Sequence, residues 1–139
     1  MQETRTMRFM IMFKTDADTE AAAPACMAIP EMGRFLEELK NDGVLIATEG
    51  LKPSSSGARL RYSGGKVSVT DGPFAEAKEL VAGFVLVDVA SRQAAVELGE
   101  RFLRVAGDGT AAEVREVFDA PHEVAHATER QAPPPAQGE

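Results

Sequence analysis

The stretch Leu80–Val89, which reads LVAGFVLVDV, is the most apolar run of the chain and decides its fold class. Its length and its valines predict a β-strand. Along a strand the even-numbered side chains point to one face and the odd-numbered side chains to the other. Both sets are apolar from 80 to 87. The earlier stretch 8–14, RFMIMFK, predicts a second strand, and its residues 9–13 are likewise apolar on both faces.

Two helices are expected between strands. The residues Met32, Phe35, Leu36 and Leu39 recur at the spacing of one helix face, and Gly43 ends that helix. Its start stays open, because Pro30 suits either a first turn or a kink in a longer helix. The second helix follows the N-cap Ser91 and ends at Gly107. Its buried stripe consists of Ala95, Leu98, Phe102 and Val105.

The remaining strands complete the order. Residues 44–49 form a strand, and residues 111–118 form a last one of mixed polarity, placed at an edge. Residues 58–62 and 66–70 alternate around Ser-Gly-Gly, which is typical of a hairpin. The order β-α-β-(ββ)-β-α-β predicts an α+β ferredoxin-like sandwich: an antiparallel sheet, both helices on one face, and the hairpin as an insertion.

The two stretches that are apolar on both faces would be the central strands of that sheet. The helices cover one face, and the chain contains no third helix for the other. Something apolar must cover it, and a second subunit is the preferred cover. A lid made by the hairpin or the C-terminal tail is the alternative. We therefore expect a homodimer.

Composition narrows the class of protein. The chain has 139 residues with a formal charge of −7, which argues against a nucleic-acid or anionic membrane surface. The one cysteine, Cys26, cannot form an internal disulfide, and no apolar run is long enough for a membrane span, so a cytoplasmic location is expected. We expect a flexible leader at 1–6, one domain at 7–119 and a disordered tail at 120–139.

One long motif carries a resemblance. The run 71–79, DGPFAEAKE, followed by Ala-Gly-Phe at 82–84, is similar to the YCII-related proteins of the DGPF-domain group. Further matches lie at 43–45 (GVL), 49–53 (EGLKP) and 63–66 (SGGK), so that the resemblance covers roughly 7–118. It implies a ferredoxin-like homodimer of the dimeric α/β-barrel type, without an established function.

The resemblance also suggests two functions. Relatives carry a His–Asp pair in a cleft, which implies a small enzyme, and genes of the DGPF group often lie beside extracytoplasmic-function sigma factors, which implies a regulatory module. In this chain both histidines, His122 and His126, fall in the predicted tail. A histidine-based mechanism is therefore not carried over.

Carboxylates are the candidate catalytic groups: Asp71, Glu79 and Glu49. Lys78 would be their electrostatic partner, and Phe74 and Phe84 the apolar wall of a ligand site. Each has a plainer interpretation that stays open. Asp71 suits a turn whose side chain bonds backbone amides, and the charged residues after it suit a solvated loop.

Other residues give weaker indications. The hairpin and the loop before it are basic, and Arg59 and Arg61 share a strand face that would suit an anion, an acidic partner or plain solvent. A nucleophilic role for Cys26 is not favoured, because no histidine lies near it in the sequence. We find no metal-ligand spacing and no phosphate-binding glycine loop, so no metal or cofactor is expected.

The resulting hypothesis is a dimer that binds a small organic molecule in a cleft, with cofactor-free acid–base chemistry by the cleft carboxylates. The alternative is a non-enzymatic interaction module. A ligand site requires polar groups that converge in a hollow. An interaction module requires a further exposed apolar patch beyond the dimer face.

Overall fold

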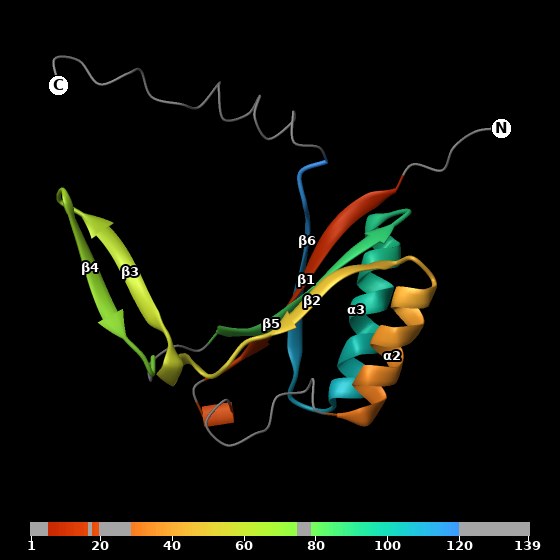
Figure 1. The fold of residues 1–139 in the computed structure, drawn as a ribbon, viewed down its shortest axis with the longest axis horizontal. Helices are drawn as coiled ribbons and strands as arrows, with labels where there is room; N and C mark the ends of the chain where they lie inside the picture. The colour runs from red at the N-terminus through yellow and green to blue at the C-terminus, as the bar shows by residue number, and fades with distance from the viewer. Residues whose placement is uncertain (1–5, 17, 20–28, 75–78, 120–139) are drawn as a thin grey trace, which may run out of the picture.

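The structure is a computed structural model, and it describes residues 6–16, 18–19, 29–74 and 79–119. The fold is α+β (Figure 1). An antiparallel sheet has the strand order β2-β5-β1-β6. Its strands are β1 (Met7–Thr15), β2 (Leu45–Gly50), β5 (Leu80–Val89) and β6 (Ala111–Glu116). The two apolar stretches are therefore the central strands, as predicted.

Helices α2 (Pro30–Asn41) and α3 (Arg92–Ala106) lie side by side on one face of this sheet (Figure 1). Helix α2 begins at Pro30, which settles the open alternative: proline has no N–H to leave unpaired in a first turn. Helix α3 has the predicted N-cap, because the Ser91 hydroxyl accepts a hydrogen bond from the Ala94 N–H at 3.0 Å.

The core lies between the sheet and the two helices. Phe102 of α3 is fully buried at its centre. Its ring meets that of Phe13 edge-on at 5.4 Å between centroids, and that of Phe35 at 4.6 Å. The buried residues of this core alternate along β1 and β5, so each strand contributes every second side chain. Those residues of the two strands are Phe9, Ile11, Phe13, Val85 and Val87.

At the start of β5, the side chains point to faces other than those predicted. Phe13 pairs with Gly83, whereas the next residue of β1, Lys14, pairs with Val81. One extra residue, Ala82, therefore stands in β5 as a β-bulge. For the residues before the bulge, the side chains point to the opposite faces from those that simple alternation gives. Leu80 is therefore buried, and Val81 is 42% exposed. The prediction that Leu80 shares a face with Phe84 and Leu86 is wrong for this reason.

The insertion between β2 and β5 forms a separate two-stranded sheet (Figure 1). It follows a short 3-10 turn, η2 (Ser54–Ser56), and consists of β3 (Ala58–Ser63) and β4 (Lys66–Asp71). The hairpin prediction is confirmed. Its two-residue turn requires glycine, since Gly64 and Gly65 have φ of +61° and +80°.

Some expectations fall outside the described residues. They are the leader up to residue 5, the tail from 120 with both histidines, Cys26, and Lys78. In the described part of the chain, no helix combines the length and the apolar character that crossing a membrane requires.

Truncation of the central ring should be costly. We expect Phe102→Ala to lower the free energy of unfolding by about 3–5 kcal/mol, because it removes a fully buried ring and leaves a cavity. Urea denaturation followed by circular dichroism measures this. Phe118→Ala is the matched control, since Phe118 is 56% exposed, and it should change stability by no more than about 0.5 kcal/mol. Equal losses in both variants would contradict this placement of the core.

Candidate functional site

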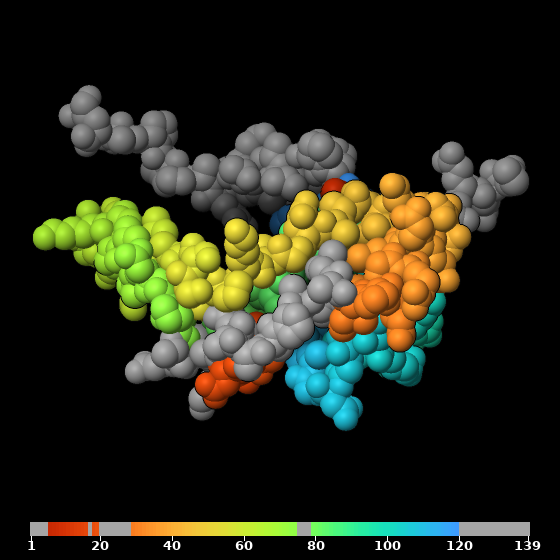
Figure 2. Space-filling model, turned by 60° about the horizontal axis from the view of Figure 1, so that its bottom comes forward, coloured from red at the N-terminus to blue at the C-terminus, as the bar shows by residue number. Residues whose placement is uncertain are grey.

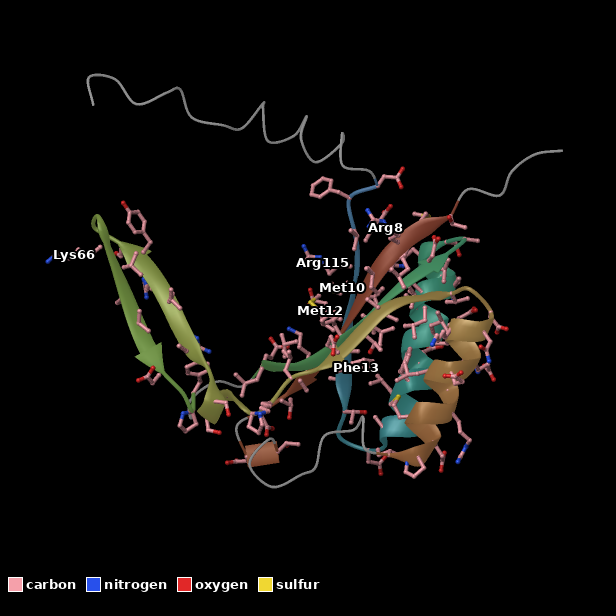
Figure 3. The ribbon with its side chains drawn as sticks, in the orientation of Figure 1. Arg8, Met10, Met12, Phe13, Lys66 and Arg115 are labelled. Carbon is pink, nitrogen blue, oxygen red and sulfur yellow. The ribbon has the colours of Figure 1, made fainter. Side chains whose placement is uncertain are left out.

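The face of the four-stranded sheet that points away from α2 and α3, here called the open face, has an apolar centre. Residues paired across antiparallel strands point to the same face. Met12 is paired with Phe84 on one side, and Met10 with Leu86. All four side chains are partly exposed, and none belongs to the buried core. Figure 3 shows Met10 and Met12 on the side of the sheet opposite the helices.

Charged side chains border this centre on the β6 side. Glu113 is the partner of Met12, and Arg115 is the partner of Met10. The Arg115 guanidinium donates a hydrogen bond to the Glu113 carboxylate at 3.1 Å, and the Lys14 ammonium lies 3.5 Å from it. The hydrogen bond from Arg115 and, second, the charge of Lys14 hold the pKa of Glu113 below its ordinary value. The sequence pattern did not single out this cluster.

On the β2 side, the structure brings together two of the predicted site residues. Glu49 and Phe84 are register partners, so the candidate carboxylate lies beside the candidate apolar wall on the open face. The Thr48 hydroxyl donates to the Phe84 carbonyl at 2.9 Å and ties β2 to β5 at this point. Glu49 is exposed, as a group that meets a ligand from solvent must be.

The other predicted residues lie at the foot of the hairpin, where β4 ends. The foot is fixed by backbone contacts: the Gly72 N–H donates to the Gly57 carbonyl at 2.9 Å, and the Gly72–Pro73 peptide is cis. The Phe74 N–H donates to the Ser54 hydroxyl at 3.2 Å. The Arg59 guanidinium stacks over the Phe74 ring, 4.1 Å from its centroid. The structure therefore places a cation against the ring of Phe74, which the sequence predicted as a wall residue.

Asp71 and Glu79 are both exposed. Asp71 pairs with Ala58 as the last residue of β4, and Glu79 directly precedes β5. Within the described ranges the Asp71 carboxylate accepts no hydrogen bond, so the turn interpretation of that side chain gains no support. Among the described residues, no hydrogen bond or ion pair joins Asp71 at the end of β4, Glu79 before β5 and Glu49 near the end of β2. The structure thus shows two groups of predicted residues, one on the open face and one at the foot.

Two surface hollows of the described residues lie elsewhere. One hollow of about 570 Å³ lies between the exposed sides of α2 and α3, where Arg101 bonds Glu38 at 2.9 Å and lies over the Phe35 ring. A second hollow, of about 430 Å³, borders the turn between α3 and β6. Neither is lined by a candidate carboxylate. Among the described residues, no cluster of histidine, cysteine and acidic side chains is arranged to hold a metal ion.

An antiparallel sheet covered on one face by two helices, with an inserted hairpin and an apolar open face, defines a small α+β domain. Comparison with known proteins is consistent with this. The model of the YCII-related domain matches residues 7–120, and the chain belongs to that family. The resemblance expected from the DGPF motif is confirmed.

A relative with a similar segment is itself an uncharacterized protein. The chain is 49% identical over 47 residues to the uncharacterized protein R00369 of Rhizobium meliloti (strain 1021). The aligned segment covers 34% of this chain and 38% of that relative, so the chain matches well under half of its length. The comparison therefore leaves the activity of the chain to be argued from its own residues.

The glycine of the DGPF motif should be indispensable at the hairpin foot. A Cβ on Gly72 would lie 1.7 Å from the backbone oxygen of Ser54, so the foot must move. We expect Gly72→Ala to lower the free energy of unfolding by about 1–3 kcal/mol, measured in urea. Gly57→Ala is the control, since its Cβ would stand 3.5 Å from the same oxygen, in ordinary contact. A tolerated Gly72→Ala would show that the foot is not closely packed.

The charged border of the open face should be visible in a titration. Arg115→Ala should raise the pKa of Glu113 toward its ordinary 4.5, and Lys14→Ala should raise it less. Because the folded pKa is lowered, the ion pair stabilises the fold above the ordinary pKa and is lost as the pH falls through the folded value. Carboxyl-carbon NMR measures both shifts. If the pKa of Glu113 were the same in Arg115→Ala as in the wild type, the hydrogen bond between Arg115 and Glu113 would be contradicted.

Proposed function

We propose that this protein is a homodimer that binds a small organic molecule over the open face of its sheet, with cofactor-free acid–base chemistry by nearby carboxylates. The proposal takes the fold to be ferredoxin-like and the assembly to be of the dimeric α/β-barrel type. The strand order β2-β5-β1-β6, with helices after the first and third of these strands in the chain, supports the first part.

The single observation that carries the proposal is the apolar open face. A sheet face that meets only water normally presents polar side chains. Here the two central strands present Met10, Met12, Phe84 and Leu86 in adjacent pairs. Burying such a patch against an equal one gains free energy in proportion to the apolar area removed from water, about 25 cal/mol per Å². A second copy of the chain supplies an equal patch by symmetry.

The charges at the two sides of the open face favour this arrangement. Glu49 lies at the β2 side and Arg115 at the β6 side of the same face. A two-fold axis parallel to the strands places the β2 side of one copy against the β6 side of its partner. Each Glu49 then faces the border formed by Lys14, Glu113 and Arg115, which carries a formal charge of +1, and the two-fold axis repeats this contact.

The same groups suit a ligand with an apolar body and a polar end. Methionine and phenylalanine side chains adapt to such a body, and Glu49, beside Phe84, is placed to accept a proton or to orient a donor. Asp71, Glu79 and Lys78 would complete the polar groups from the hairpin foot and the segment after it, with Phe74 as a second wall. In this proposal the ligand lies between the two open faces.

A second candidate function rests on a different observation. The hairpin exposes a further apolar patch, formed by Leu60, Tyr62, Val67 and Val69, which an interaction module requires. The family resemblance suggests a sigma-factor pathway as its setting. In that case the patch binds a different protein, and the open face serves only for dimerisation.

The open face is tested by placing a charge in it. We expect the wild-type chain of 14.9 kDa to sediment as a dimer at micromolar concentration, and Met12→Glu to sediment as a folded monomer, because a buried carboxylate would lack a partner. Ala90→Glu, with the same change in charge in an exposed turn, should remain dimeric.

Two outcomes would contradict the proposal: a monomeric wild type, or a Met12→Glu variant as dimeric as Ala90→Glu. Ligand binding is read separately with the fluorescent probe 1-anilinonaphthalene-8-sulfonate, which has an apolar body and an anionic end. The wild-type dimer should bind it in a saturable way, and Glu49→Gln should bind it more tightly once the negative charge is removed. Unsaturable binding by the dimer would reject a formed site.

A further inference from the structure

The hairpin β3–β4 has one apolar and one basic face. In its register Leu60 pairs with Val69, and Tyr62 pairs with Val67, so these four side chains share a face. They are 65%, 61%, 74% and 58% exposed, in that order. The opposite face carries Arg59, Arg61 and Lys66, each paired with a serine or a threonine. The described part of the chain leaves these four apolar residues largely exposed.

A hairpin of this kind needs support. A two-stranded sheet without a packed face is at best marginally stable in water. Figure 2 shows the hairpin standing out from the rest of the molecule. The contacts of Gly72, Phe74 and Arg59 at its foot all lie within residues 54–74 and hold the foot together. Its outer part, from residue 60 to residue 69, relies on something else for a cover.

The hairpin lies on the side of the sheet opposite the helices. Figure 3 shows its Lys66 pointing away from the sheet, and the apolar residues lie on the hairpin face opposite that of Lys66. Figure 3 also shows Met10, Met12 and Arg115 on the side of the sheet opposite the helices, which is the side of the hairpin. A protein that covers the open face therefore also comes close to the hairpin.

Charge complementarity indicates what this covering protein is. Residues 58–71 contain three basic side chains and one acidic side chain, a formal charge of +2. Since the whole chain has a formal charge of −7, the residues outside the hairpin carry −9. A second copy of the chain therefore attracts the hairpin electrostatically. Two copies related by a two-fold axis satisfy both hairpins at once.

We infer that the apolar face of the hairpin docks on a second copy of this chain, so that each copy holds the other with its hairpin. The inference rests on the proposed dimer and adds a second contact to it. It has a consequence for the site. The hairpin foot carries Asp71 and Phe74, so docking of the hairpin fixes the position of these candidate residues in the dimer only. The ligand site is then incomplete in a monomer.

The chain has a natural probe for this contact. Tyr62 is its one tyrosine, and it has no tryptophan, so tyrosine fluorescence reports on the apolar face of the hairpin alone. We expect acrylamide to quench this fluorescence efficiently in dilute protein and weakly once sedimentation shows a dimer. The monomeric Met12→Glu variant should be quenched efficiently at every concentration.

A pair of matched variants tests the face itself. The double variant Leu60→Asp, Val69→Asp should raise the dissociation constant of the dimer by at least about tenfold, since two apolar contacts are lost and two carboxylates are buried. The double variant Ser68→Asp, Thr70→Asp adds the same charge to the opposite face of the hairpin. Because it removes the same positive charge but no apolar contact, it should raise the dissociation constant several-fold less than the first variant does.

The outcomes separate this inference from the proposed dimer. A monomeric wild type overturns both. A wild-type dimer that Met12→Glu dissociates, but in which Tyr62 stays open to acrylamide, overturns only the hairpin contact and leaves the patch to a different protein. Equal effects of the two double variants overturn it as well. Protection of Tyr62 from acrylamide in the monomeric variant would also overturn the hairpin contact, since the hairpin would then pack on its own chain.

Discussion

The structure depends on one constraint: its two central strands are apolar on both faces. Strands β1 and β5 bury one set of side chains, including Ile11 and Val85, under the two helices. The other set, including Met12 and Phe84, stays partly exposed on the open face. A helix pair can cover only one side of a sheet. The proposed dimer, its ligand site and the inferred role of the hairpin all depend on how the second side is covered.

Most of the fold was predictable because its determinants are local. Helical spacing from Met32 to Leu39, the N-cap Ser91 and the glycine turn of the hairpin each act within a few residues. The bulge at Ala82 was not predictable. Alternation reveals a bulge only where apolar and polar residues change places, and every residue from 80 to 87 is apolar. Strand ends differ by one or two residues, where side chains carry little pattern.

The candidate site was predictable in its residue types and less so in its arrangement. Glu49 and Phe84 were both named from the sequence, but their pairing follows from the register of two strands that are far apart in the chain. Arg59 was assigned to a basic hairpin face, whereas its stacking on Phe74 depends on how the foot folds around Ser54. The cluster of Glu113 with Arg115 and Lys14 gave no signal, because it depends on the pairing of β1 with β6, which lie far apart in the sequence.

The hairpin shows how the same pattern carries two meanings. Alternation that places Arg59 and Arg61 on one face also places Leu60 and Tyr62 on the other. Attention to the charges alone suggests a solvated hairpin, yet the apolar side is what makes the element unstable by itself. If that side is buried only against a second copy, then assembly and ordering of the hairpin are one event. Because the foot is continuous with the hairpin, the positions of Asp71 and Phe74 become properties of the dimer and not of the single chain.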